Sequence, residues 1–225
     1  MFLPLIVMPQ SIKQYASIPY RTYGGNIVND EVESLRYALD YGNSNQILCF
    51  IGGFCDTLYK LIWRVFCGSL WYKMQMDSKQ TRFHNDVSHF TMLYMSFNCY
   101  RFLLDFIPKL NGAGYEVSVI SHSWGAKNIV RSCLDSNRVK LAKLITLDCV
   151  GHFHINFRPK CIESWENIYI TDYFSQYSRA NLAAIIGGAK QYIDYADINT
   201  GIPPPAHHAS VLTMLSHAKL IKLQH

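Results

Sequence analysis

Short hydrophobic runs alternate along this chain with segments in which hydrophobic residues recur at helical spacing. The runs are typical of strands buried on both faces of a sheet, and the spaced residues are typical of helices with one buried face. Strands are predicted at 46–51, 90–97, 116–121, 143–147 and 167–171, with a weaker one at 191–196. Helices are predicted at 30–41, 58–66, 102–110, 126–134 and 211–223. This alternation predicts an α/β fold, with a mostly parallel central sheet and helices on both faces.

One predicted strand ends abruptly in Ser121-His122-Ser123-Trp124-Gly125, directly before a predicted helix. A tight turn from strand to helix forces its central residue into a strained conformation and pushes the side chain out above the sheet. Small residues are needed two positions to either side, because the two backbones nearly touch there; the usual pattern is G-x-S-x-G. Ser121 replaces the first glycine. The motif predicts that Ser123 is a nucleophile, with a structural turn serine as the alternative.

Four segments of the sequence resemble the α/β-hydrolase superfamily, and within it lipase-like and esterase-like serine hydrolases. They are CFIGGF at 49–54, ISHSWGA at 120–126, LITLD at 144–148 and HHASV at 207–211. Their order and spacing agree with the superfamily over residues 45–225. The resemblance implies one α/β-hydrolase-like domain over residues 1–225, with 1–44 as an N-terminal segment of uncertain role. It implies serine chemistry and no cofactor.

The resemblance also implies the chain order Ser, then Asp or Glu, then His for the catalytic triad. Two aspartates end predicted strands beyond Ser123, and both would lie at the carboxyl edge of the sheet. Asp148 is the preferred acid and Asp172 the alternative; for either, the competing interpretation is an aspartate that caps a backbone turn. His208 is the preferred base and His207 the alternative, because both lie between a Gly/Pro loop and the last helix.

An oxyanion hole requires backbone donors beside the nucleophile. The N–H group of Trp124 is one predicted donor. The N–H group of Phe54 is the other, because the Gly-Gly-Phe stretch at 52–54 resembles the superfamily's oxyanion loop, and glycines let the backbone approach a substrate. An ordinary glycine turn is the alternative for this stretch.

Composition narrows the class of protein and its setting. Hydrophobic residues make up 49% of the chain and charged residues 16%, which is typical of a globular protein. Seven cysteines without a C-x-x-C pair favour a cytoplasmic or other reducing compartment, and secretion without a signal peptide remains open. The apolar start, MFLPLIVMPQ, lacks the features of a signal peptide and is expected to be a docking strand or a truncated edge.

Charge bears on the partners that the protein binds. The net charge of +5 is dispersed, which favours peripheral contact with an anionic membrane surface over binding to nucleic acid. Residues 59–74 mix aromatic and basic side chains. They predict either a helix on a membrane or acyl pocket, or a core helix whose basic side chains reach solvent. His152 and His154, near Cys149 and Cys161, match no zinc spacing, so no metal site is predicted.

These observations predict a serine esterase or lipase that acts on a small-molecule or lipid ester, with a place in lipid metabolism. Thioesters and peptides can be cleaved by the same triad. A secreted or injected lipase that attacks membranes is a further hypothesis. The alternative from a different class is an inactive α/β-hydrolase fold that serves as a binding or regulatory module, which the replaced glycine at Ser121 leaves open.

Overall fold

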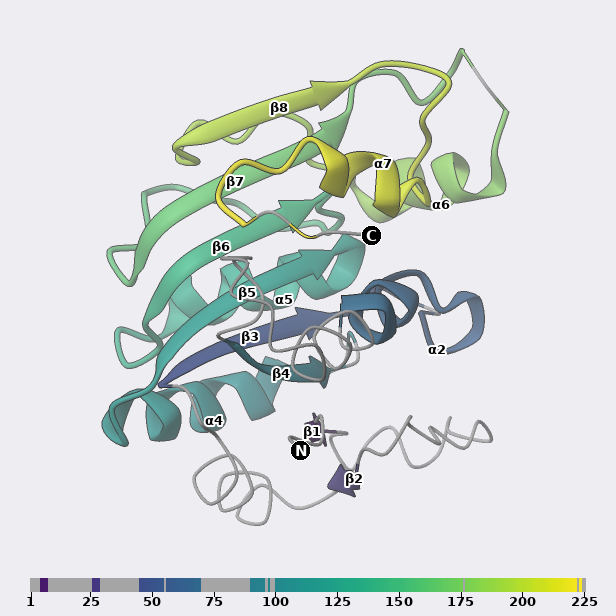
Figure 1. Cartoon of the computed structure of the whole chain (residues 1–225). Coiled ribbons are helices and arrows are strands. Elements are labelled where there is room, and N and C mark those ends of the chain that lie inside the picture. Colours follow the sequence, from purple (N-terminus) through teal and green to yellow (C-terminus); the bar gives the residue numbers. More distant parts are fainter. Residues whose placement is uncertain are drawn as a thin grey trace.

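Eight parallel strands form one sheet in the part of the chain that the computed structural model describes (Figure 1). The described residues are 5–7, 26–28, 45–54, 56–69, 90–95, 97, 100–175, 177–221 and 223. The predicted helix at 30–41 lies outside them. The strands are β1 (Leu5–Val7), β2 (Asn26–Val28), β3 (Gln46–Ile51), β4 (Phe90–Met95), β5 (Glu116–His122), β6 (Leu141–Leu147), β7 (Ile162–Ile170) and β8 (Ile198–Ile202).

The order of the strands places two loops side by side at the carboxyl edge of the sheet. The order is β2-β1-β4-β3-β5-β6-β7-β8, so that β3 lies between β4 and β5. The chain passes from β3 to one side and then returns to the other, and ligands of open α/β sheets bind at such a switch point. In the register of β3 and β5, Ile51 pairs with Ser121. The loops that follow these strands therefore leave the sheet next to one another.

Helices cover both faces of the sheet, as predicted. They are α2 (Asp56–Tyr59), residues 61–69, α4 (Tyr100–Gly112), α5 (Ser123–Asp135), α6 (Arg179–Gly187) and α7 (Val211–Ser216). One core cluster joins α4 and α5 to the sheet, and a second joins residues 61–69, α6 and α7 to it. Alternate residues of β3 enter opposite clusters, which explains its continuous hydrophobic run. The fold is α/β, of the α/β-hydrolase-like class.

Two sequence expectations about the periphery agree with the structure. The chain start contributes a docking strand, since β1 pairs in parallel with both β2 and β4. Residues 61–69 form a core-facing helix: Ile62, Val65 and Phe66 are buried, and Arg64 points to solvent. The described part of the chain contains no helix of the length and hydrophobicity that crossing a membrane requires.

The strand predicted at 191–196 is wrong, because the last strand is β8, at Ile198–Ile202. The Asn199 side chain accepts from the N–H of Ile193 (3.1 Å) and donates to the Ile193 carbonyl (3.0 Å). The Asn199 side chain thus hydrogen-bonds the backbone N–H and carbonyl of Ile193, the groups that would pair with a neighbouring strand if residues 191–196 formed one. Helix α6 was not predicted, because two of its large residues, Leu182 and Ile186, are exposed and give no hydrophobic stripe.

The last helix is shorter than the predicted 211–223, and a buried carboxylate explains where it ends. Glu166 lies on β7 and is fully buried. Its carboxylate accepts from the N–H groups of Lys219 (2.8 Å) and Leu220 (2.9 Å). These bonds replace the helical hydrogen bonds that would continue α7 beyond Ser216. They also fasten the segment that follows α7 to the middle of strand β7.

Candidate functional site

The turn from β5 to α5 has the strained geometry that the sequence motif predicts. Strand β5 ends at His122, and Ser123 begins α5 with a φ of 56°. Positive φ is uncommon for residues other than glycine, and such strain gathers at functional sites. The N–H of Val150 donates to the carbonyl of Ser123 (3.2 Å), which fixes the turn from the side of β6.

The residues two positions to either side of Ser123, Ser121 and Gly125, are both small, and at Gly125 two backbones approach closely. A Cβ on Gly125 would lie 2.3 Å from the carbonyl oxygen of Gly52, in the loop after β3. Ser121, in place of the usual glycine, is fully buried, and its hydroxyl donates to the carbonyl of Ile145 on β6 (3.2 Å). The departure from the usual pattern is therefore accommodated by one hydrogen bond.

Replacing Gly125 by alanine is expected to lower the free energy of unfolding by about 1–3 kcal/mol, because the new Cβ meets backbone that cannot rotate away. Gly112, at the end of α4, is the matched control, since a Cβ there meets nothing within 4 Å. The Gly112→Ala variant should be neutral or up to about 1 kcal/mol more stable. Urea unfolding of both variants measures the difference; equal stabilities would contradict the close approach.

A hydrogen-bonded chain of three side chains lies at this turn. The Nε2 of His208 is 2.9 Å from the Oγ of Ser123, and its Nδ1 is 2.6 Å from the Oδ2 of Asp148. All three residues are buried. They come from the ends of β5 and β6 and from the loop between β8 and α7, so the carboxyl edge brings together residues that are far apart in sequence.

Asp148 is held by more than the histidine. Its Oδ1 accepts from the N–H of Ile170 (3.1 Å) and from the hydroxyl of Tyr173 (2.5 Å). Burial, with the neighbouring Asp148 charge, raises the pKa of Tyr173 above its ordinary value. The phenol therefore remains a donor, and the carboxylate is fixed with one oxygen toward His208.

The backbone of His208 is also held by side chains on both of its polar groups. Its N–H donates to Asn181 (2.8 Å), whose amide in turn donates to the carbonyl of Tyr173 (3.2 Å). Its carbonyl oxygen lies 2.9 Å from the Nε2 of His122, and the two imidazole rings lie 4.7 Å apart. His122, Asn181 and Tyr173 were not predicted. His122 stands inside the motif and could have been noticed; the other two give no sequence signal.

His122 is a neutral histidine inside the site. Burial, followed by the charge of nearby His208, lowers the pKa of His122 to about 3. Because its Nε2 faces a carbonyl, the proton resides on Nε2. Among the described residues its Nδ1 has no hydrogen-bond partner. His122 therefore acts as a fixed donor and adds no charge beside His208.

This depressed pKa predicts a loss of stability in acid. Below pH about 6.5 the unfolded chain protonates His122, whereas the folded protein does not until pH about 3, so stability falls as the pH drops through this window. We expect His122 to contribute about 2–3 kcal/mol of the loss between pH 7 and 4.5. Asparagine does not titrate, so the His122→Asn variant lacks this loss. The natural protein's advantage in free energy of unfolding over the variant should therefore be smaller at pH 4.5 than at pH 7 by that amount. A difference that stays constant between pH 7 and 4.5 would contradict this.

The alternative acid and base make local bonds instead. The Asp172 carboxylate accepts from the N–H groups of Phe174 (2.7 Å) and Ser175 (3.0 Å), and these bonds lower the pKa of Asp172. This is the turn-capping role that competes with catalysis. The Nδ1 of His207 accepts from the N–H of Ala209 (3.2 Å). Asp148 and His208, the preferred residues, are the pair that lies with Ser123.

Both predicted oxyanion donors lie beside the serine. A Cβ on Gly53 would be 2.8 Å from the Cβ of Ser123, so the loop that carries Phe54 lies against Ser123. Trp124 is the second residue of α5, and N–H groups in a first helical turn have no acceptor within the helix. The rings of Phe54 and Trp124 lie 6.5 Å apart, and both side chains are exposed.

A buried aspartate supports the loop that carries Phe54. Asp56 accepts from the hydroxyl of Tyr94 (2.6 Å) and from the N–H groups of Ile62 (2.8 Å) and Trp63 (3.2 Å). Burial raises the pKa of Asp56, and these hydrogen bonds oppose the increase. A Cβ on Gly52 would meet this carboxylate at 2.7 Å. Asp56 is a further residue that sequence reasoning missed.

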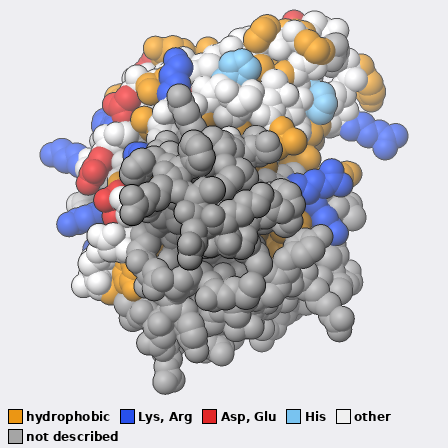
Figure 2. Space-filling view, viewed as in Figure 1, with side chains coloured by type: hydrophobic (Ala, Val, Ile, Leu, Met, Phe, Trp, Pro, Cys, Tyr) orange, Lys and Arg blue, Asp and Glu red, His pale blue; other side chains and the backbone are white. Residues whose placement is uncertain are grey.

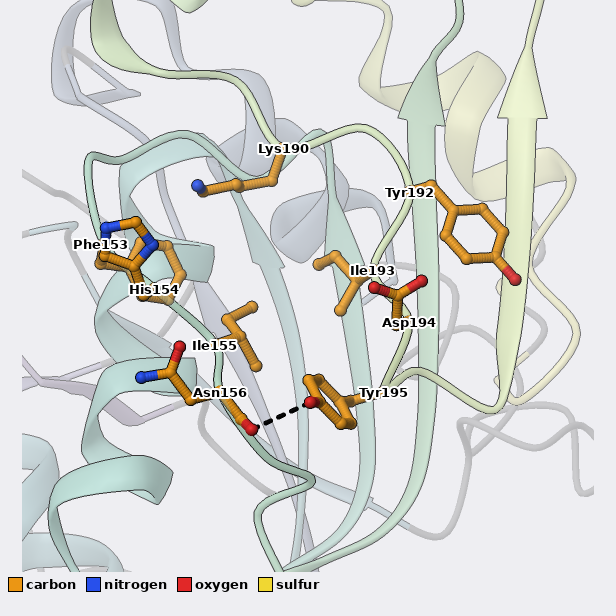
Figure 3. A pocket seen from close by; sticks show the side chains of 9 residues that line it. All are labelled: Phe153, His154, Ile155, Asn156, Lys190, Tyr192, Ile193, Asp194 and Tyr195. Atoms are coloured by element: carbon orange, nitrogen blue, oxygen red, sulfur yellow. Dashed lines mark hydrogen bonds between the residues drawn. The ribbon is translucent and has the colours of Figure 1, made fainter.

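A separate hollow of about 210 Å³ lies between two loops and is not lined by Ser123, Asp148 or His208. Figure 3 shows these loops, residues 153–156 and 190–195, facing one another, with Lys190 extending toward Phe153 and His154. The Tyr195 hydroxyl donates to the Asn156 carbonyl (2.9 Å) across the gap. Within the described residues, no group of three His, Cys, Asp or Glu side chains could hold a metal ion.

The fold and the site together define an α/β protein of the α/β-hydrolase-like class, with a Ser-His-Asp hydrogen-bonded chain at the carboxyl edge of its sheet. No protein-family model matches the chain, and no curated protein is significantly similar to it.

Proposed function

We propose that this protein is a serine hydrolase that cleaves a carboxylic ester through an acyl-enzyme. The observation that carries the proposal is the chain of hydrogen bonds from Ser123 through His208 to Asp148, at a strained turn between strand and helix. A serine hydroxyl is a weak nucleophile by itself. It becomes effective when a histidine accepts its proton and a carboxylate orients that histidine.

The proposed reaction uses each of these residues in turn. The Oγ of Ser123 attacks the ester carbonyl while His208 takes the hydroxyl proton, and Asp148 stabilises the resulting imidazolium. The N–H groups of Phe54 and Trp124 donate to the oxyanion. His208 then gives its proton to the departing alcohol. Water, activated by His208, attacks the acyl-enzyme and releases the acid together with the free serine.

Exposed aromatic side chains beside the serine favour an ester with an apolar acyl group. The rings of Phe54 and Phe97 lie 5.3 Å apart, and Trp124 adjoins Phe54. Phe54 is 65% exposed although it is beside a buried nucleophile. An acyl chain leaving Ser123 along these rings would be removed from water, which favours binding in proportion to the apolar area buried.

A fluorophosphonate probe tests the proposal, because it phosphonylates only an activated serine. We expect labelling of Ser123, identified by peptide mass, and no labelling after His208→Ala. Ester, thioester and peptide substrates offered in parallel would define the acyl group and the leaving group. A well-folded protein that no probe labels would instead support an inactive α/β-hydrolase fold that acts as a binding or regulatory module.

A further inference from the structure

Large exposed hydrophobic side chains are numerous at the carboxyl edge of the sheet, the edge at which Ser123 lies. Within the described residues, most of the exposed large hydrophobic side chains follow the carboxyl ends of strands; they are Phe54, Tyr59, Trp124, Phe174, Tyr177, Leu182, Ile186 and Leu212. Phe174 is 83% and Tyr177 is 88% exposed. Hydrophobic side chains are visible in Figure 2 at the upper right, over the region of α6 and α7. Aromatic residues displayed in this way are typical of interfaces.

Acidic side chains are distributed unequally between the two edges of the sheet, whereas basic side chains lie at both. Lys60, Arg64, Lys127 and Arg179 belong to elements that follow strand ends, and Lys140, Lys143, Arg158 and Lys160 lie at or near strand starts. The ammonium group of Lys127 lies 4.3 Å from the centre of the Trp124 ring, so a cation stands one helical turn from Ser123.

Exposed acidic residues lie mostly at the opposite edge. Four exposed acidic residues in the described part of the chain lie at or near the starts of strands, and a fifth lies at the last residue of α5. They are Glu116, Glu163, Asp194, Asp197 and, on α5, Asp135. Asp105 lies within α4, and Asp172 is the exception at the carboxyl edge. Basic charge is therefore less offset by acidic charge at the edge that bears the serine than at the opposite edge, and this difference favours that edge for contact with an anionic surface.

We propose that this carboxyl edge docks on the surface of an anionic phospholipid bilayer. Aromatic side chains would enter the boundary between headgroups and acyl chains, and the basic side chains would contact the headgroups, as interfacial segments do. The biological role of such docking rests on the proposed function, because docking in this orientation turns Ser123 toward ester bonds in the lipid. Docking itself requires no catalysis.

The test measures binding in a background that cannot turn over lipid. The Ser123→Ala protein is mixed with vesicles of phosphatidylcholine alone, or with about one third phosphatidylglycerol, and bound protein is separated by flotation. We expect binding to the anionic vesicles that weakens as salt rises from about 0.05 to 0.5 M. Adding Phe174→Ser and Tyr177→Ser should weaken it by about tenfold or more, because two exposed aromatic side chains are lost.

The matched control removes an exposed aromatic side chain at the opposite edge of the sheet. Phe157 is 55% exposed and precedes Arg158, which bonds to Ile162 and Asp197 near the starts of β7 and β8, so Phe157→Ser should leave binding unchanged where Phe174→Ser alone weakens it. An equal loss in Phe157→Ser and Phe174→Ser, or no vesicle binding by the Ser123→Ala parent, would overturn the proposal. So would a parent that dimerises through Phe174 and Tyr177 without binding vesicles. Because every protein in the assay lacks the nucleophile, these results are independent of whether the protein is a hydrolase.

Discussion

Replacing Ser123 by alanine is expected to abolish hydrolysis of p-nitrophenyl esters, lowering kcat by at least about a thousandfold. The substitution removes one oxygen and its 2.9 Å contact with His208 and leaves the Cβ in place. Alanine meets the same backbone strain as serine at a φ of 56°, so the fold should persist. Rates across acyl lengths, measured for the natural protein beside the variant, would also give the length of the acyl site.

Ser118 provides a matched control for this substitution. It lies on the same strand, β5, and is fully buried, and among the described residues its hydroxyl has no hydrogen-bond partner. Ser118→Ala therefore removes the same atom without a known contact, and both stability and kcat should be retained. Equal activity in the natural protein and in Ser123→Ala, or no activity of the folded natural protein on any ester, would refute the proposed nucleophile.

The second large effect is expected at the acid. Asp148→Asn should lower kcat by about four orders of magnitude, because an amide turned toward His208 favours the wrong tautomer and cannot stabilise its charged form. Asp172→Asn should leave kcat within about twofold, since that carboxylate accepts from groups of its own turn, at Phe174 and Ser175. Steady-state rates of the two variants on one ester measure the contrast.

Stability measurements are needed beside these rates. Asp148 also accepts from Ile170 and Tyr173, so its replacement is expected to lower the free energy of unfolding by about 1–3 kcal/mol. Activity should be compared at a temperature where both variants are folded by circular dichroism. A large loss of kcat in Asp172→Asn, with Asp148→Asn active, would assign the acid to the end of β7 instead of β6.

The sheet could be predicted from the sequence wherever strands are buried on both faces. β3 is an almost continuous apolar run for this reason, β5 is buried from Val117 to His122, and the predicted bounds of both are close to the observed ones. The edge strand β8 reads INTGI and is only partly buried, so its pattern is weak and the prediction fell on residues 191–196. The end of α7 could not be predicted, because it depends on Glu166, far away in sequence.

For the candidate site too, residues defined by a local motif could be predicted from the sequence, and residues defined by contacts between distant segments could not. Ser123 and its glycine follow from a motif confined to five residues. The acid could be reduced to Asp148 or Asp172 by their places at strand ends, and the base to His208 or His207 by their place between a Gly/Pro loop and the last helix. Tyr173 and Asn181 could not be found, because their importance lies in contacts with Asp148 and His208 that arise only in the folded chain.

The carboxylate that ends α7 has a consequence for the order in which the protein folds. His208 is 85 residues from Ser123 and 60 from Asp148, and its segment is fastened to Asn181 before α7 and to Glu166 after it. Contacts of such long sequence separation form late, after the strands that they join. The strained serine turn can therefore be made during synthesis while its base is still absent. The proposed nucleophile would stay unactivated until the segment that carries His208 docks.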